Sequence, residues 1–361
     1  SPALCAMSTS IRRPRPRAAA SPGSRSALDP SLPNPSSAEG LASRLLEIAN
    51  AGALCLAISV GHRAGLFDAL ARLRNGGTAD EIAREAELDP RYVQEWLGAL
   101  AAGGLVEIRG EDGTYHLPKG YAELLTWRGA SANLAVVMRW IPLLSRVEDR
   151  LLGCFREGGG LGYEEYPGFQ ETMAELSGQT VVAALFDAIL PLEPELAPRL
   201  RHGLDVLDVG CGQGRAVLAM ASEFPSSSFH GIDISRQAIE RARAEAREMG
   251  LHNARFTVAD AALLEDPACF DLVTAFDAIH DQAHPDRVLA NIRRSLRPDG
   301  LFLMQDIATH SDVADNLDHP LGPFLYTLSF GHCMSVSLSQ GGACLLYTSD
   351  AADDRRGVEL G

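Results

Sequence analysis

Three glycines within five positions follow an aliphatic run in the segment VLDVGCGQG, residues 206–214. Gly210, Gly212 and Gly214 let the backbone turn sharply out of a strand and approach a ligand that a Cβ atom would push away. A glycine turn of this kind is typical of nucleotide-binding sites. Its GxGxG spacing differs from the dinucleotide pattern GxGxxG, so the glycines alone leave the ligand open.

Aspartates lie near the ends of three predicted strands: Asp208 in the first, Asp233 after the second and Asp260 after the third. A carboxylate after the second strand can accept hydrogen bonds from both ribose hydroxyls, and one after the third can accept from an adenine amino group. Three acids are costly beside a pyrophosphate but favourable beside a sulfonium and an ammonium. We therefore expect S-adenosylmethionine (SAM) as the cofactor, with NAD as the alternative. A second interpretation of Asp208 is a buried acid satisfied by loop amides.

A histidine and an aspartate, His280 and Asp281, follow the fourth predicted strand. A histidine that titrates near neutral pH can take the proton from a hydroxyl acceptor, and Asp281 can orient its ring or cap the next helix. Because a sulfonium methyl is already activated, holding the acceptor in line can be worth about 7 to 11 kcal/mol. The other interpretation is that His280 packs a helix start and that the acceptor is an amine needing only positioning.

The glycines, aspartates and histidine can form one site only if the ends of their strands lie close together in a sheet. The residues after Pro198 alternate between strand and helix, with predicted strands at 204–209, 228–232, 254–258, 270–275 and 301–304. Helices are predicted at 215–224, 235–249 and 285–296. The alternation predicts an α/β fold, a Rossmann-like doubly wound parallel sheet that binds ligands at the carboxyl ends of its strands.

A smaller helical unit is predicted at residues 38–122. Thr78 and Glu81 form a capping box before one helix, and Asp89 with Pro90 begins the next. Strands at 105–108 and 114–117 flank the turn RGEDG. Helix, turn, helix and hairpin together predict a winged helix.

The charge of this unit argues against DNA as its partner. Between Thr78 and Leu100 two basic residues stand against six acidic ones, so the net charge is 2 − 6 = −4, and the whole chain carries −15. Phosphate repels so acidic a helix. We expect a homodimer, with the winged helix packing or dimerising and with Arg91, Tyr92 and Trp96 in domain packing.

The remaining segments are assigned by composition. Residues 123–197 are predicted to be a helical connector, interrupted at 157–169 by EGGGLGYEEYPGF, a mobile loop able to cover a site. Residues 1–37 are predicted to be disordered or a non-native leader, with an organelle transit peptide as the alternative. Residues 344–361 resemble a back-translated sequencing adapter, so we expect the SAM-binding domain, residues 198–343, to be truncated before two further strands.

The composition excludes several other classes. At 361 residues and 46% hydrophobic, the chain can bury more than one core. Its seven cysteines show no zinc spacing, which predicts no metal site and a reducing, cytoplasmic compartment. No uninterrupted apolar run approaches the roughly 20 residues that span a bilayer, so no membrane partner is expected.

Four segments together resemble the motifs of the Rossmann-like methyltransferases that use SAM: VLDVGCGQG, GIDIS, VAD and LRPDGLFLM. The resemblance covers Gly203 to about Met304. It implies that the glycines line the methionyl part, that Asp233 binds the ribose, and that Ile234 and Asp260 contact the adenine. The implied cofactor-binding residues are Asp208, Gly210, Gly212, Gly214, Asp233, Ile234, Asp260 and Ala261.

A winged helix before AIHDQAHPD is similar to small-molecule O-methyltransferases, in which the His-Asp pair carries the catalytic base, here His280 and Asp281. HPLGPFLYT resembles a mostly bacterial group with the same winged helix. Gln282 stands where the O-methyltransferases often have tryptophan, and Phe276 where a basic residue is expected. The resemblance therefore implies methyl transfer to a small molecule and leaves oxygen or nitrogen open as the acceptor atom.

Two other functions remain open from the sequence, a SAM-sensing regulator that uses the winged helix and an NAD-dependent oxidoreductase. Three late residues, His319, Tyr326 and His332, have roughly helical spacing. They either line an acceptor pocket or pack in the core.

Overall fold

The computed structural model describes residues 37–110, 113–127, 133–307, 309–310 and 312–342. The chain divides into two compact units between Pro142 and Leu143, and each is described by itself. This division falls inside the predicted connector, 123–197. The predictions for residues 1–36 and 344–361 lie outside the described residues.

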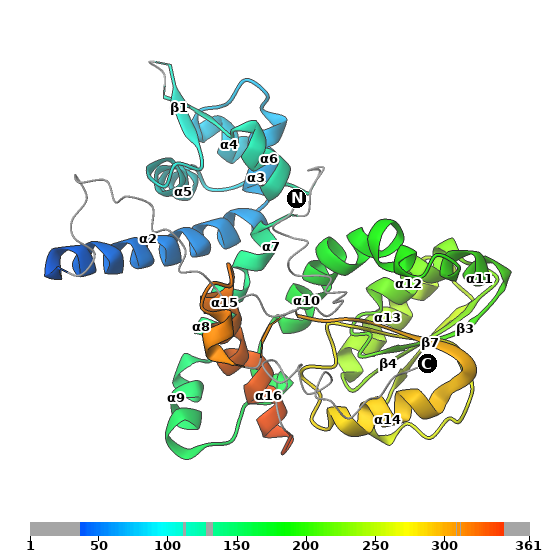
Figure 1. The fold of residues 1–361 in the computed structure, drawn as a ribbon. Coiled ribbons are helices and arrows are strands. Elements are labelled where there is room, and N and C mark those ends of the chain that lie inside the picture. Colours follow the sequence, from blue (N-terminus) through cyan, green and yellow to red (C-terminus); the bar gives the residue numbers. More distant parts are fainter. Residues whose placement is uncertain (1–36, 111–112, 128–132, 308, 311, 343–361) are drawn as a thin grey trace, which may run out of the picture. The chain divides into compact units, whose positions relative to one another are not determined.

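The N-terminal unit is a winged helix, as predicted (Figure 1). Thr78 and Glu81 form the expected capping box, and the Asp89 carboxylate accepts from two backbone amides of the next helix. The two hairpin strands pair antiparallel, with Ile108 opposite Tyr115. The elements are α2 (Ala38–Arg63), α3 (Leu66–Arg72), α4 (Ala79–Ala86), α5 (Pro90–Ala102), β1 (Glu107–Arg109), β2 (Thr114–His116), α6 (Lys119–Leu125) and α7 (Ala135–Met138), and α8 (Trp140–Ser145) follows at the division.

Trp96 of α5 packs in the core of this unit. Trp96 is 8% exposed, its Nε1 donates to the Ala57 carbonyl at 2.8 Å, and its ring packs edge-on against Phe67. Tyr92, by contrast, is 81% exposed, and Arg91 forms an exposed ion pair with Glu95. Packing within this unit is therefore confirmed for Trp96, whereas Tyr92 and Arg91 lie on the outer face of α5, where a role in contacts with another domain or copy stays a prediction.

The C-terminal unit is built on a five-stranded parallel sheet of order β5-β4-β3-β6-β7. Its strands are β3 (Asp205–Val209), β4 (Ser228–Asp233), β5 (Ala254–Val258), β6 (Phe270–Phe276) and β7 (Leu296–Gln305). All five predicted strands are present, and β7 is longer than expected. Its register with β6 shifts between Phe270 and Leu272.

Helices cover both faces of this sheet, which confirms the doubly wound fold (Figure 1). Val206 and Leu272 pack into one core with α12 and α13, whereas the next residues, Leu207 and Val273, pack into the other core with α14. The helices around the sheet are α11 (Leu196–His202), α12 (Arg215–Glu223), α13 (Arg236–Glu248), α14 (Pro285–Ser295) and the short 3-10 helix η5 (Ala261–Leu263).

Further helices flank the sheet in sequence. Before it come α9 (Glu148–Glu157), η1 (Tyr163–Glu165), α10 (Phe169–Ser177), η2 (Gly178–Val182), η3 (Leu185–Ile189) and η4 (Leu190–Leu192). After it come η6 (Val313–Asn316), α15 (Gly322–Leu328), η7 (Ser329–Cys333) and α16 (Met334–Ser339).

Two helical stretches of the described chain, Ala38–Arg63 and Phe169–Leu192, have the length and apolar composition that crossing a membrane requires. Leu185 and Ile189 of the second stretch belong to the buried core beside the sheet, as core helices of soluble domains do. The first stretch, α2, leaves several large apolar side chains exposed. The expectation of no membrane partner therefore stays a prediction.

A glycine at the start of α12 supports a prediction about stability. Gly214 has a φ of +75°, and a Cβ atom there would lie 2.5 Å from the Phe256 ring. Gly214→Ala should therefore lower the free energy of unfolding by about 1 to 3 kcal/mol, measured by urea denaturation. Gly153→Ala in α9 is the control, because a Cβ atom added there would have no other atom within 4 Å. This variant should be neutral or more stable by about 0.5 to 1 kcal/mol. Equal stabilities of the two variants would contradict the prediction.

Candidate functional site

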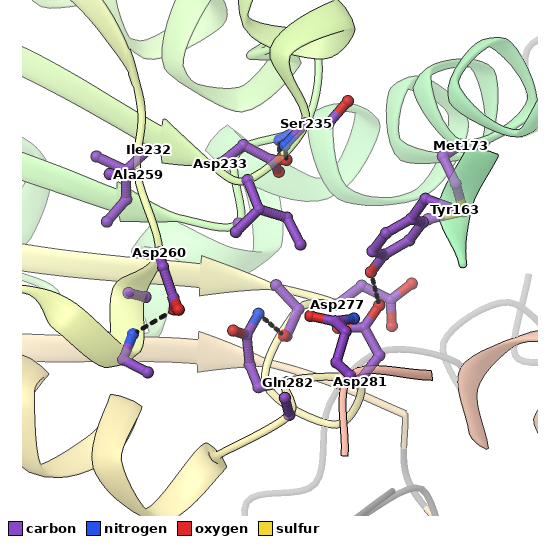
Figure 2. A pocket seen from close by; sticks show the side chains of 18 of the residues that line it. Tyr163, Met173, Ile232, Asp233, Ser235, Ala259, Asp260, Asp277, Asp281 and Gln282 are labelled. Atoms are coloured by element: carbon purple, nitrogen blue, oxygen red, sulfur yellow. Dashed lines mark hydrogen bonds between the residues drawn. The ribbon is translucent and has the colours of Figure 1, made fainter. Parts of the chain in front are cut away.

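An open cavity with an empty volume of about 910 Å³ lies at the carboxyl edge of the sheet (Figure 2). It forms where β3, β4, β5 and β6 end, because parallel strands present these ends on one side. Its wall is completed by residues that precede the sheet by more than 30 positions, among them Tyr163 and Phe169. The lining residues are Tyr163, Phe169, Gln170, Met173, Gly210, Gly212, Ile232, Asp233, Ile234, Ser235, Ala259, Asp260, Ala261, Ala262, Asp277, Ala278, Asp281, Gln282, Ala283, His284 and Gln340.

The glycine turn after β3 forms the floor of the cavity. Gly210 has a φ of +70°, and a Cβ atom there would lie 2.5 Å from the Cβ of Ala278. The Gly212 amide donates to the Asp233 carboxylate at 2.8 Å. Gly210 and Gly212 therefore line the cavity as expected, whereas Gly214 starts α12 and packs against Phe256 away from it.

Asp233 joins this turn to the start of α13. One carboxylate oxygen accepts from Gly212 and the other accepts from the Ser235 amide at 2.7 Å. Burial raises the pKa of Asp233, although the two amides oppose that shift. Ser235 caps α13 through the Ala238 amide, as predicted. Asp233 thus lines the cavity and also positions the glycine turn.

Asp208 lies beneath the cavity lining. It is 3% exposed, and it accepts a hydrogen bond of 2.6 Å from the Thr274 hydroxyl. Burial raises its pKa to about 7. The interpretation of Asp208 as a buried, satisfied acid is favoured over direct cofactor contact, and its partner is a side chain of β6 instead of the expected loop amides.

The residues assigned to the adenine line the same cavity. Ile234, Asp260 and Ala261 all line it, and Asp260 also caps η5 by accepting from the Ala262 amide at 2.8 Å. Figure 2 shows Asp260 at the end of the cavity opposite to Tyr163, with Asp233 between them. The aspartates assigned to the adenine and to the ribose therefore lie in one cavity, and Asp233 is the nearer of the two to Tyr163.

His280 is paired with Asp306, a residue that sequence reasoning missed. Its Nδ1 lies 2.6 Å from the Asp306 carboxylate, which also accepts from the His280 amide at 3.2 Å. Burial alone lowers the pKa of His280, but the Asp306 carboxylate outweighs it and holds that pKa well above its usual range. The pKa of Asp306 is lowered in return, because the His280 charge outweighs the effect of burial. The ring does not line the cavity.

Asp281 and Asp277, by contrast, do line the cavity. The Tyr163 hydroxyl donates to one Asp281 oxygen at 2.9 Å (Figure 2). Burial raises the pKa of Tyr163, and the nearby Asp281 raises it further. Asp277 has a φ of +55°, a region that aspartate tolerates, and burial raises its pKa to about 6. Asp277 and Asp306 were detectable in principle, since each follows a strand directly.

The predicted covering loop lies against the cavity through Tyr163 and Phe169. It is fastened to the helices after the sheet: the Leu161 amide donates to Ser335 at 2.8 Å, and the Tyr166 hydroxyl donates to the Gly331 carbonyl at 2.8 Å. Its predicted mobility stays a prediction.

The three late aromatic and imidazole residues do not line the cavity. Instead, His332 stacks on Phe169 with ring centroids 4.2 Å apart, and burial lowers its pKa to about 3. His319 accepts from the Leu321 amide, and the Tyr326 hydroxyl accepts from Asn316. His332 is therefore a core-packing residue, which was the alternative interpretation.

Two family models match the chain. A model described as "Methyltransferase domain" matches residues 200–321, and one described as "Rv2258c-like winged HTH domain" matches residues 52–127.

Two curated methyltransferases are similar to part of the chain. The chain is 43% identical to nocamycin O-methyltransferase of Saccharothrix syringae over 105 residues, which are 28% of this chain and 36% of that protein. It is 26% identical to (S)-coclaurine N-methyltransferase of Papaver somniferum over 165 residues, 46% of either chain. The chain thus spans less than half the length of these two relatives.

A solved structure supports the fold of both domains. Human N-acetylserotonin methyltransferase in complex with SAM has a TM-score of 0.55 and 20% identity, covering 81% of this chain and 86% of that one. At this identity the likeness bears on the fold alone. The chain therefore carries a winged helix-turn-helix domain, matched over residues 52–127, followed by a methyltransferase domain, matched over residues 200–321.

Proposed function

We propose that the chain transfers a methyl group from SAM to a small-molecule acceptor, at oxygen or nitrogen. One observation carries the proposal: a single cavity is lined by Gly210 and Gly212 of the glycine turn, by Asp233 and by Asp260. Both relatives named above are methyltransferases, one acting at oxygen and one at nitrogen by their names.

The cofactor residues divide the work by position. Asp260 and Ile234 receive the adenine, Asp233 the ribose hydroxyls, and the backbone of Gly210 and Gly212 the methionyl group. These residues fit the cofactor, because a Cβ at Gly210 would collide with Ala278 and narrow the floor. Bound SAM supplies a methyl group activated by a cationic sulfur, so the protein has to position the acceptor behind it.

For a hydroxyl acceptor, His280 is the candidate base. Asp306 orients its Nδ1 and raises its pKa, so the ring is a stronger base but is unprotonated only at higher pH. Because His280 lies behind the lining, its action also requires a path through Asp281 or a water molecule. An amine acceptor needs no such base.

We also propose that the protein is a homodimer joined through α2. Leu41, Leu45 and Ile48 recur at the spacing of one helical face, and all three are more than half exposed. An apolar stripe of this kind is covered by a partner in most soluble proteins. A second copy of this chain is the simplest partner, because a twofold axis places the apolar stripe of one copy against the same stripe of the other.

The first prediction of this proposal tests ribose recognition. Asp233→Ala removes a carboxylate that faces the cavity and holds the glycine turn, so S-adenosylhomocysteine binding should weaken by about 1.5 to 3 kcal/mol in calorimetry. Asp299→Ala, at an exposed position of β7, serves as the control. An unchanged affinity in Asp233→Ala would remove this residue from the cofactor site.

A second prediction concerns the charge of His280. In an NMR titration its imidazole should titrate above its usual pKa of about 6.5, because the Asp306 carboxylate stabilises the protonated ring. Asp306→Asn should bring that pKa below 6.5, since burial then dominates. Any dependence of the rate on unprotonated His280 should shift to lower pH in the same variant. A His280 pKa that Asp306→Asn leaves unchanged contradicts the pairing.

A third prediction follows for catalysis. With a hydroxyl acceptor found by screening, His280→Ala should reduce turnover about a hundredfold or more while S-adenosylhomocysteine affinity stays the same. With an amine acceptor the same variant should keep most of its turnover. Near-normal turnover on the hydroxyl acceptor would reduce His280 to a structural residue.

A fourth prediction tests the homodimer. Leu41→Lys with Leu45→Lys places two charges on the exposed stripe and should convert a dimer to a monomer, as measured by light scattering. Asn50→Lys lies about half a helical turn away from the stripe and should leave the dimer intact. A monomeric wild-type protein would contradict the proposal, and vesicle binding by that monomer would assign the stripe to a membrane.

A further inference from the structure

One end of the cavity carries two carboxylates that the cofactor assignments do not use. Asp277 and Asp281, here called the acidic wall, lie beside Tyr163 and away from Asp260 (Figure 2). Tyr163 donates to Oδ2 of Asp281, which leaves Oδ1 for a ligand. Among the described residues the Asp277 carboxylate forms no hydrogen bond, although His280, with a ring nitrogen within 4.8 Å of it, partly offsets its charge. The carboxylate oxygens of the acidic wall can therefore accept further hydrogen bonds, at the end of the cavity where we place the substrate that receives the methyl group.

The cavity has little positive charge to balance this wall. Its described lining residues include four aspartates and one histidine, His284, but neither lysine nor arginine. The nearest imidazole behind the wall, His280, is already paired with Asp306. SAM carries one negative and two positive groups, a net charge of +1. Two carboxylates and the cofactor therefore leave −2 + 1 = −1 at this end of the cavity.

Aromatic rings stand at the same end. Tyr163 and Phe169 both line the cavity, with ring centroids 5.4 Å apart. Aromatic faces attract cations, and carboxylates bind ammonium groups through charge-assisted hydrogen bonds. The same surroundings repel a carboxylate or phenolate acceptor.

We propose that the acceptor is an amine, bound as its ammonium ion between the acidic wall and the rings of Tyr163 and Phe169, and that the methyl group goes to nitrogen. The inference rests on the proposed methyl transfer and chooses between its two acceptor atoms.

The transfer balances with the groups present. The ammonium gives one proton to a carboxylate of the acidic wall, and the free nitrogen then bonds to the methyl carbon while the carbon–sulfur electron pair goes to sulfur. The products are S-adenosylhomocysteine and the N-methylated ammonium, and the carboxyl proton passes to solvent. Burial raises the pKa of both carboxyls, that of Asp277 to about 6, which brings them closer to an amine.

The first experiment compares probes that differ in one heavy atom. Benzylamine, phenethylamine and cyclohexylmethylamine are titrated into the S-adenosylhomocysteine-saturated full chain beside the three corresponding alcohols. Each is also incubated with SAM, and products are identified by mass spectrometry. At least one amine should bind tenfold or more tightly than its alcohol and be methylated at nitrogen.

Matched variants locate the effect. Asp277→Asn and Asp281→Asn keep the side-chain shape but remove the charge, so each should lower the affinity of the best amine fivefold or more and that of S-adenosylhomocysteine less than threefold. The control Asp299→Asn should change neither. The inference is overturned if no amine binds at millimolar concentration, if alcohols bind as well as amines, or if the wall variants bind amines normally. Failure of the wild-type chain to bind S-adenosylhomocysteine would instead contradict the proposed function.

Discussion

The reversal of strand order at β3 is the constraint on which the site depends. The chain builds β3, β4 and β5 outward in one direction, then returns to place β6 on the other side of β3. Connections on the two sides of β3 leave the sheet toward opposite faces, which opens a crevice at its carboxyl edge. The glycine turn after β3 and the Asp277–Asp281 segment after β6 are therefore neighbours across this crevice, as the close approach of Gly210 to Ala278 records. The position of the cavity therefore follows from the strand order and does not depend on the side chains that line it.

Charge distinguishes the chemistry of this crevice from that of a dinucleotide site. Asp233 and Asp260 satisfy local backbone amides at the starts of helical segments as well as facing the cavity, so their positions are fixed before a ligand arrives. Preorganised carboxylates cost no further ordering when hydroxyl, amino or ammonium groups bind. Behind them, the close contact of His280 with Asp306 compensates both charges in a buried place. The His280 charge also partly offsets Asp277 and Asp281, but these two carboxylates lie on the cavity side of the pair and leave a net negative charge there.

The predicted covering loop, residues 157–169, connects the cavity to helices that come before and after the sheet in the sequence. Gly160 approaches the Ser335 carbonyl so closely that no larger residue fits, and Leu161 and Tyr166 bond to the same helical region. Phe169 in turn stacks on the buried His332. These contacts aim the Tyr163 hydroxyl at Asp281, so the shape of the acceptor end depends on η7 and α16 as much as on the sheet.

The sequence by itself determined the local features of this protein. The capping box of Thr78 and Glu81, the cap at Ser235 and the turn at Gly210 and Gly212 involve residues close in the chain, and periodic apolar residues mark each strand. Strand alternation then implied a parallel sheet, and acids after strands implied where a cofactor binds.

Only the tertiary structure decided the partners of the chemical groups. His280 pairs with Asp306 at a separation of 26 residues, Asp208 with Thr274 at 66, and Asp281 with Tyr163 at 118. Such pairings depend on which strands are adjacent, on their register and on the helices that pack across their ends. No local sequence pattern specifies these long-range pairs. Backbone propensities and local hydrogen bonds relate only residues that are a few positions apart in the chain.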